Sequence, residues 1–178
     1  LRRYAKLESR STVFSFPNQP LEIWENAQES LRERNFIRFD SDKVSDLQIA
    51  TNDRYLTLQK LESGEWQLLT KDDNGQLSTI AADKPTIERL LSRLANLSAL
   101  QFVSDAPSSE DLERYGFDQF QRRVQIGLED NSKKNLIIGQ FLLDDLNRRG
   151  TNRIYVKNES TPSVYLTTAS ILSELSLN

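Results

Sequence analysis

The stretch RYLTLQKLESGEWQLLT, residues 54–70, carries the clearest strand pattern of the chain. Its first half alternates apolar and polar residues, and Trp66 and Leu68 alternate in the same way after the turn Glu62-Ser63-Gly64. Such alternation places one face of a strand on a core and leaves the other face in water. The stretch therefore predicts an antiparallel hairpin, with the Trp66 ring packed under a helix.

Other stretches of the chain also show the patterns of strands and helices. Further short strands are expected at 44–49, 122–128, 134–139, 153–157 and 163–167. Asp83 and Pro85 open a predicted helix over 83–98, whose apolar stripe is formed by Ile87, Leu90, Leu91, Leu94 and Leu97. A shorter helix is expected over 108–116, with a capping box at Ser108 and Asp111 and an end at Gly116. The fold class is α+β: antiparallel sheets of meander hairpins packed with a long amphipathic helix and shorter helices.

Two distant stretches resemble each other without a gap. YAKLESRSTVF, residues 4–14, and YVKNESTPSVY, residues 155–165, share Tyr, Lys, Glu, Ser and Val at matching positions. Each predicts a strand, a turn and a strand, followed by an apolar-striped helix. We expect residues 1–39 to be the tail of a preceding repeat unit and residues 40–178 to be one α+β unit. The alternative is a chance match, because many hairpins share this pattern.

Composition excludes several classes of site. The 178 residues contain 23 Lys plus Arg and 26 Asp plus Glu, and this mild acidic balance argues against nucleic-acid binding. Cysteine and histidine are absent, so thiolate chemistry, the commonest general base and the commonest transition-metal ligand are all missing. The apolar runs are too short to span a bilayer. We therefore predict no enzyme activity, no cofactor and no metal site.

Two acidic motifs agree with that prediction. KDDNGQ, residues 71–76, lacks the first and last carboxylates of a calcium loop and is interpreted as an Asn-Gly hairpin turn. Asp144 and Asp145 are adjacent and point apart on a strand or loop, and Arg148 and Arg149 keep both ionised. Neither motif supports catalysis.

The segment GQFLLDDLNRRGTN, residues 139–152, is longer than a tight hairpin requires. One interpretation continues the strand through Leu143 with alternate residues on the core. The other makes Phe141, Leu142 and Leu143 an apolar extension that contacts a partner. These three residues are the candidate partner contact.

Four motifs, in order, resemble those of the bacterial domain-of-unknown-function family 4340. They are Gly64-Glu65-Trp66, the leucine-striped helix after Asp83, Tyr115-Gly116-Phe117-Asp118 and Ile138-Gly139. The resemblance covers about residues 36–167. The chain departs from the family pattern at Phe117, where leucine is usual, and at Gln119-Phe120, where a proline is usual.

This resemblance implies a place in the cell envelope. Members look like extracytoplasmic proteins anchored to the inner membrane by an N-terminal helix, and they resemble accessory parts of ABC-transporter or gliding-type systems. We therefore expect a non-enzymatic scaffolding module, with no catalytic residues carried over. The alternative is a binding module for an envelope glycan or peptide, which requires Trp24, Trp66 or Tyr115 to face solvent.

Overall fold

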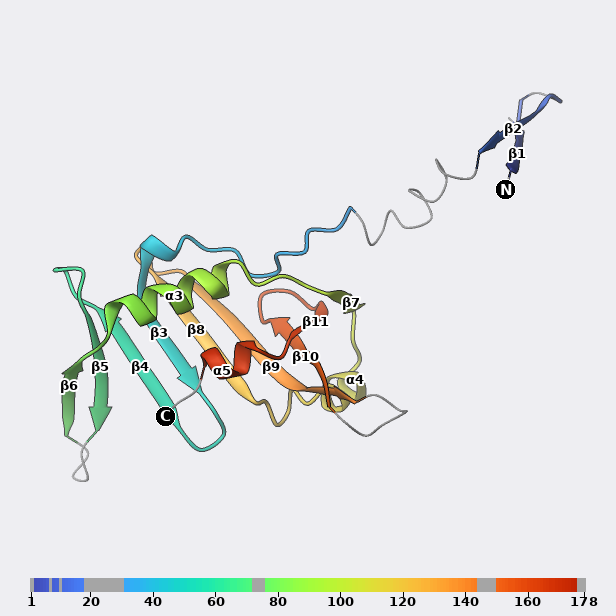
Figure 1. The fold of residues 1–178 in the computed structure, drawn as a ribbon. Helices are drawn as coiled ribbons and strands as arrows, with labels where there is room; N and C mark the ends of the chain where they lie inside the picture. Colours follow the sequence, from blue (N-terminus) through green and yellow to red (C-terminus); the bar gives the residue numbers. More distant parts are fainter. Residues whose placement is uncertain are drawn as a thin grey trace. The chain divides into compact units, whose positions relative to one another are not determined.

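An antiparallel sheet organises the larger part of the chain (Figure 1). The computed structural model describes residues 2–6, 8–9, 11–17, 31–71, 76–143 and 150–175. Within them nine strands pair in the order β6-β5-β4-β3-β8-β9-β10-β11-β7. Their bounds are β3 Val44–Ala50, β4 Tyr55–Lys60, β5 Trp66–Lys71, β6 Leu77–Ala81, β7 Gln101–Ser104, β8 Arg122–Leu128, β9 Lys133–Leu143, β10 Gly150–Asn158 and β11 Val164–Thr168. Neighbouring strands are antiparallel throughout, so the predicted antiparallel architecture is confirmed.

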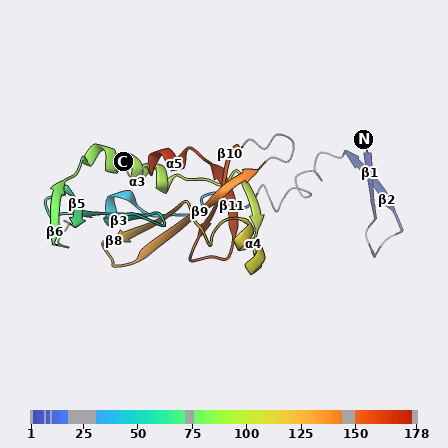
Figure 2. The ribbon, with the colours of Figure 1, turned by 90° about the horizontal axis from the view of Figure 1, so that it is seen from below.

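Helices α3 (Lys84–Ala95) and α5 (Ile171–Glu174) lie on one face of the sheet (Figure 2). The core between helices and sheet contains Ile87, Leu90, Leu91 and Leu94 of α3 and, from the strands, Leu47, Val124, Ile126, Leu136, Ile138, Ile154 and Val156. Trp66 belongs to this core and is 3% exposed. It lies near Leu91 of α3, so its predicted position under the helix is confirmed.

The prediction of a long helix over 83–98 is wrong. Helix α3 has 12 residues and ends at Ala95. Two side-chain amides donate hydrogen bonds to carbonyl oxygens of its last turn. Asn96 Nδ2 donates to the Ser92 oxygen at 2.8 Å, and Asn35 Nδ2 donates to the Ala95 oxygen at 2.8 Å. The chain then leaves the helix and pairs Ser98 with Asn35 in a β-bridge. Leu97 stays buried beyond the helix end, which is why it fits the apolar stripe.

The chain divides into two compact units, Leu1–Glu33 and Arg34–Asn178. The expected boundary was 39/40, but residues 34–39 belong to the larger unit. Phe36 and Ile37 are part of its buried core, and the Phe36 ring stacks on Tyr165 with centroids 4.8 Å apart. Whether residues 1–39 are the tail of a preceding repeat unit stays a prediction.

The two similar stretches form hairpins of the same register. In the smaller unit, β1 (Arg2–Lys6) pairs with β2 (Val13–Pro17), and Lys6 faces Val13. In the larger unit Lys157 of β10 faces Val164 of β11, which is the same alignment, and all five pairs of each hairpin correspond. The segment after β2 that carries Leu21 and Trp24 lies outside the described residues.

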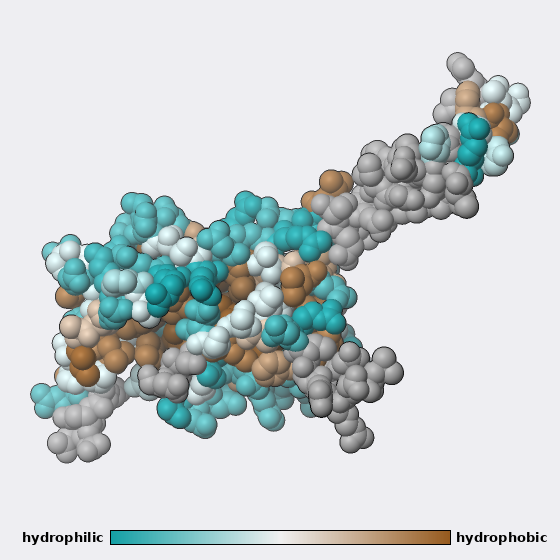
Figure 3. Space-filling model, in the orientation of Figure 1, coloured by the Kyte–Doolittle hydropathy of each residue, from teal (hydrophilic) through white to brown (hydrophobic). Residues whose placement is uncertain are grey.

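Strand β6 forms one edge of the sheet, and all five of its residues are exposed. Figure 3 shows hydrophilic residues over the outward side of α3 and hydrophobic residues toward the β5–β6 end. Large apolar side chains exposed at this end include Tyr55, Leu77 and Ile80. Among the strands described, β6 pairs only with β5, so its outer backbone groups face solvent.

Candidate functional site

Helix α4 (Ser109–Arg114) forms one wall of the site, and its N-terminus is closed by the predicted capping box. Ser108 Oγ accepts from the Asp111 amide at 3.1 Å, and the Asp111 carboxylate accepts from the Ser108 amide at 3.0 Å. The Ser108 amide and the Ser108 hydroxyl both donate to the Asp111 carboxylate, and together with the neighbouring Arg114 guanidinium they hold the pKa of Asp111 below its usual value. The short helix is therefore held in place by its own cap.

The turn after α4 is fastened to strand β9 through two glycines. Gly116 has φ +75°, and a Cβ there would lie 2.9 Å from the Gln140 nitrogen. A Cβ on Gly139 would lie 2.2 Å from the Tyr115 carbonyl oxygen. That oxygen accepts the Gln140 amide at 2.9 Å. The motifs Tyr115-Gly116-Phe117-Asp118 and Ile138-Gly139 thus meet in space, and the backbones approach because neither glycine carries a side chain.

Stacked aromatic rings hold the same turn on strand β10. The rings of Tyr115 and Tyr155 stack with centroids 4.5 Å apart, and Phe117 meets Tyr115 edge-on at 6.4 Å. Burial raises the pKa of Tyr155. Tyr115 is 8% exposed and Trp66 is buried as well, while Trp24 lies outside the described residues. Trp66 and Tyr115 therefore do not present aromatic platforms to a glycan.

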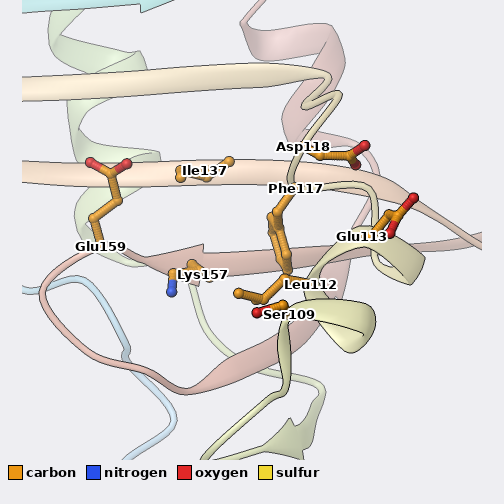
Figure 4. Close-up of a pocket in the computed structure, with 8 residues that line it drawn as sticks. All are labelled: Ser109, Leu112, Glu113, Phe117, Asp118, Ile137, Lys157 and Glu159. Carbon is orange, nitrogen blue, oxygen red and sulfur yellow. The ribbon is translucent and has the colours of Figure 1, made fainter.

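A cavity of about 700 Å³ lies between α4 and the sheet (Figure 4). Its lining consists of Ser109, Leu112, Glu113, Phe117, Asp118, Ile137, Lys157 and Glu159. Ile137 and Lys157 are register partners on β9 and β10. They alternate with Leu136, Ile138 and Val156, which belong to the core under α3. The cavity therefore opens on the sheet face opposite α3. We call it the α4 pocket.

Three carboxylates and one ammonium group surround the apolar part of the α4 pocket. In Figure 4 Glu159 lies on one side, Glu113 and Asp118 lie on the other, and the Phe117 ring stands between them. Glu159 is 3.3 Å from an Arg123 nitrogen, and its amide donates to the Asn135 oxygen at 3.0 Å. Such a lining can make ion pairs, hydrogen bonds and apolar contacts. No group of three or more Asp or Glu side chains suited to a metal ion occurs among the described residues.

The family is shown by comparison with known sequences. The family model of the domain of unknown function DUF4340 matches residues 76–178. The chain belongs to this family. The matched range contains α4, both glycine motifs and the β10–β11 hairpin, and so the whole lining of the α4 pocket. Gly64-Glu65-Trp66 lies before it. No curated protein and no solved structure matches this DUF4340 chain.

The candidate partner contact lies elsewhere in this DUF4340 domain. Strand β9 continues through Leu143, as the core-strand interpretation expected. Phe141 is 38% exposed and Leu142 is half-buried, while the side chain of Leu143 lies outside the described part. Asp144, Asp145 and the Asn-Gly turn at 74–75 also lie outside it. Partner contact at Phe141, Leu142 and Leu143 stays a prediction.

Sequence reasoning missed the α4 pocket, although two signals pointed toward it. Lys157 and Glu159 belong to the phrase shared by the two hairpins, at the positions of Lys6 and Glu8. Phe117 is the residue at which the chain departs from the family motif, and it lines the pocket.

No helix in the described ranges is long and apolar enough to cross a bilayer.

Proposed function

We propose that this domain is a non-enzymatic extracytoplasmic module, an accessory or scaffolding part of an ABC-transporter-associated envelope complex. Its contact surface is the α4 pocket. The observation that carries this proposal is that two family motifs pack on each other to build one wall of that pocket. Surface cavities with an apolar floor and charged rim are ordinary binding sites.

The chemistry of the chain favours binding over catalysis. The α4 pocket offers a serine hydroxyl, but the chain has no histidine to activate it and no cysteine to serve as a nucleophile. Its carboxylates flank an apolar surface and do not face each other across a reacting position. The transporter association rests on the family resemblance, and the extracytoplasmic location rests on it as well.

The second candidate is a module that binds an envelope peptide or glycan without a transporter. The mixed apolar and acidic lining of the α4 pocket supports the peptide form of this alternative. The burial of Trp66 and Tyr115 weighs against the glycan form, because that form requires these aromatic side chains to face solvent.

Site-specific photo-crosslinking in the cells that make the protein tests the proposed function. Benzoylphenylalanine replaces Ser109, an exposed residue that lines the pocket, and the matched control replaces the exposed Glu62 in the β4–β5 turn. We expect adducts with ABC-transporter or gliding-type components from position 109 alone. Equal adducts from both positions, or adducts that contain no such component, contradict the proposal.

Location is tested independently with one introduced thiol. Because the chain contains no cysteine, Glu62→Cys provides a single labelling site on an exposed turn. A maleimide that cannot cross the inner membrane should label this variant in cells whose outer membrane is permeabilised. Labelling only after lysis of the inner membrane would place the domain in the cytoplasm and overturn the extracytoplasmic assignment.

A further inference from the structure

The floor of the α4 pocket is apolar and is formed by three side chains. Leu112 comes from α4, Phe117 from the following turn and Ile137 from the centre of β9. Leu112 and Phe117 are each half-buried, and Ile137 is 6% exposed. Covering such a surface removes apolar area from water, which is the usual source of anchor energy at an interface.

Carboxylates outnumber ammonium groups in the lining of the α4 pocket, three to one. Glu113 and Asp118 are exposed at one side of the floor, and Glu159 lies at the other side. Arg123 already accompanies Glu159 at 3.3 Å, so the Glu113–Asp118 side carries the stronger attraction for a cation. The half-buried Lys157 lies beside Ile137, and its ammonium group can donate to a carbonyl oxygen of a ligand that lies on the floor of the pocket.

We propose that the α4 pocket binds a peptide segment in which a leucine or phenylalanine side chain is next to lysine or arginine. The apolar side chain contacts Phe117 and Ile137, and the neighbouring cation pairs with Glu113 and Asp118. A peptide backbone also presents carbonyl oxygens, which match the Lys157 ammonium. Anionic lipid headgroups do not fit, because the carboxylates of the rim repel them.

This inference rests on the proposed function only in taking the ligand to be part of a protein. Its test uses the purified chain and two probes that differ in charge, acetyl-Lys-Leu-Phe-Lys-amide and acetyl-Glu-Leu-Phe-Glu-amide. Chitotetraose serves as the glycan probe. Backbone amide shifts are followed by NMR during titration of each probe. We expect the basic peptide alone to shift signals of Leu112, Phe117, Ile137 and Lys157.

A charge variant with a matched control identifies the rim. Glu113→Gln with Asp118→Asn should weaken binding of the basic peptide about fivefold, the combined effect of two exposed ion pairs. Glu62→Gln with Glu88→Gln removes the same charge from exposed positions outside the α4 pocket and should leave the affinity unchanged. Raising the salt concentration should weaken binding to the unmodified chain more than to the rim variant.

Several results would overturn the inference. They are equal binding of both peptides, shifts confined to residues outside the α4 pocket, a response to chitotetraose alone, or equal losses in the rim and control variants. The proposed function fails separately. If the basic peptide binds as described but crosslinks from position 109 contain no transporter component, the ligand class stands and the transporter assignment falls.

Discussion

Gly139 leaves the space that the carbonyl oxygen of Tyr115 needs, since a Cβ at residue 139 would lie 2.2 Å from that oxygen. The Gln140 amide donates to the same oxygen, so the turn after α4 and strand β9 are joined at their backbones. The position of α4, and with it the wall of the α4 pocket, depends on this close approach.

Gly139→Ala should therefore destabilise the domain by about 1–3 kcal/mol, the usual cost of forcing an extra methyl group into a packed site. The measurement is urea unfolding followed by tryptophan fluorescence. Gly127→Ala is the matched control on neighbouring β8. Its Cβ would meet the Asp46 carboxylate, which is the end of a side chain and can turn away. A loss at Gly139 no larger than at Gly127 would contradict the role assigned to this contact.

Trp66→Ala tests the core beneath α3. The ring is 3% exposed, and removal of a buried aromatic side chain costs about 3–5 kcal/mol. Because this substitution also removes a fluorophore, far-UV circular dichroism should follow its unfolding in urea. Tyr55→Ala, on the neighbouring strand β4 at a position 65% exposed, should cost less than about 1 kcal/mol. Similar losses for the two variants would remove Trp66 from the core.

The Asp111 cap makes a prediction about pH. Hydrogen bonds from Ser108 lower the pKa of Asp111 in the folded state. The contribution of this cap is complete above the unfolded value of about 3.9 and is lost as pH falls through the lower folded pKa. NMR titration of the Asp111 carboxyl should give a midpoint below the ordinary aspartate value of about 3.9. In Ser108→Ala the midpoint should rise because the hydroxyl donor is lost, and an unchanged midpoint would exclude the Ser108 hydroxyl as a cause of the lowered pKa.

Metal binding is predicted to be absent. The chain lacks histidine and cysteine, and KDDNGQ lacks the terminal carboxylates that enclose calcium. Thermal melts with and without millimolar calcium or zinc should therefore superimpose. A ligand present at 100 times its dissociation constant would add about 2.7 kcal/mol, so an increase in Tm of several degrees would reveal a site.

Local patterns predicted the elements correctly where neighbouring residues decide them. The alternation in 54–70 predicted β4 and β5, and Asp83 and Ser108 each cap the helix that follows. The end of α3 could not be predicted from neighbouring residues, because the side chain that donates to the Ala95 carbonyl oxygen belongs to the distant Asn35. An apolar stripe indicates which residues are buried, but it does not show where the helix ends. Leu97 is buried although it lies beyond the end of α3.

The α4 pocket could not be predicted for a related reason. Ile137 and Lys157 become neighbours through the register of β9 and β10, and Phe117 reaches them only because Gly139 admits the Tyr115 carbonyl. Each of these is a contact between residues far apart in the sequence. In the sequence Phe117 is marked by its departure from the family motif, and such a departure does not by itself identify a binding site.

The hairpins allow a direct test of equivalence by exchange. Residues 155–165 are replaced by the sequence of residues 4–14, which retains Lys157 and Val164 as facing partners. If the two stretches are equivalent parts of successive units, this chimera should fold cooperatively and keep the signals of the α4 pocket. The main losses should come from Val156→Ala, which opens a cavity, and from Asn158→Leu.

Asn158 is buried, and its amide donates to the Phe36 oxygen at 2.9 Å while accepting from Ser160. A chimera that retains Asn158 should therefore recover about 1–3 kcal/mol, the cost of leaving buried partners unsatisfied. The control chimera inserts residues 5–15 instead, which shifts the pattern by one position and turns every strand side chain to the opposite face. It should fail to fold. If both chimeras fold equally well, or if neither does even with Asn158 retained, the shared phrase is a coincidence and residues 1–39 are no repeat of this unit.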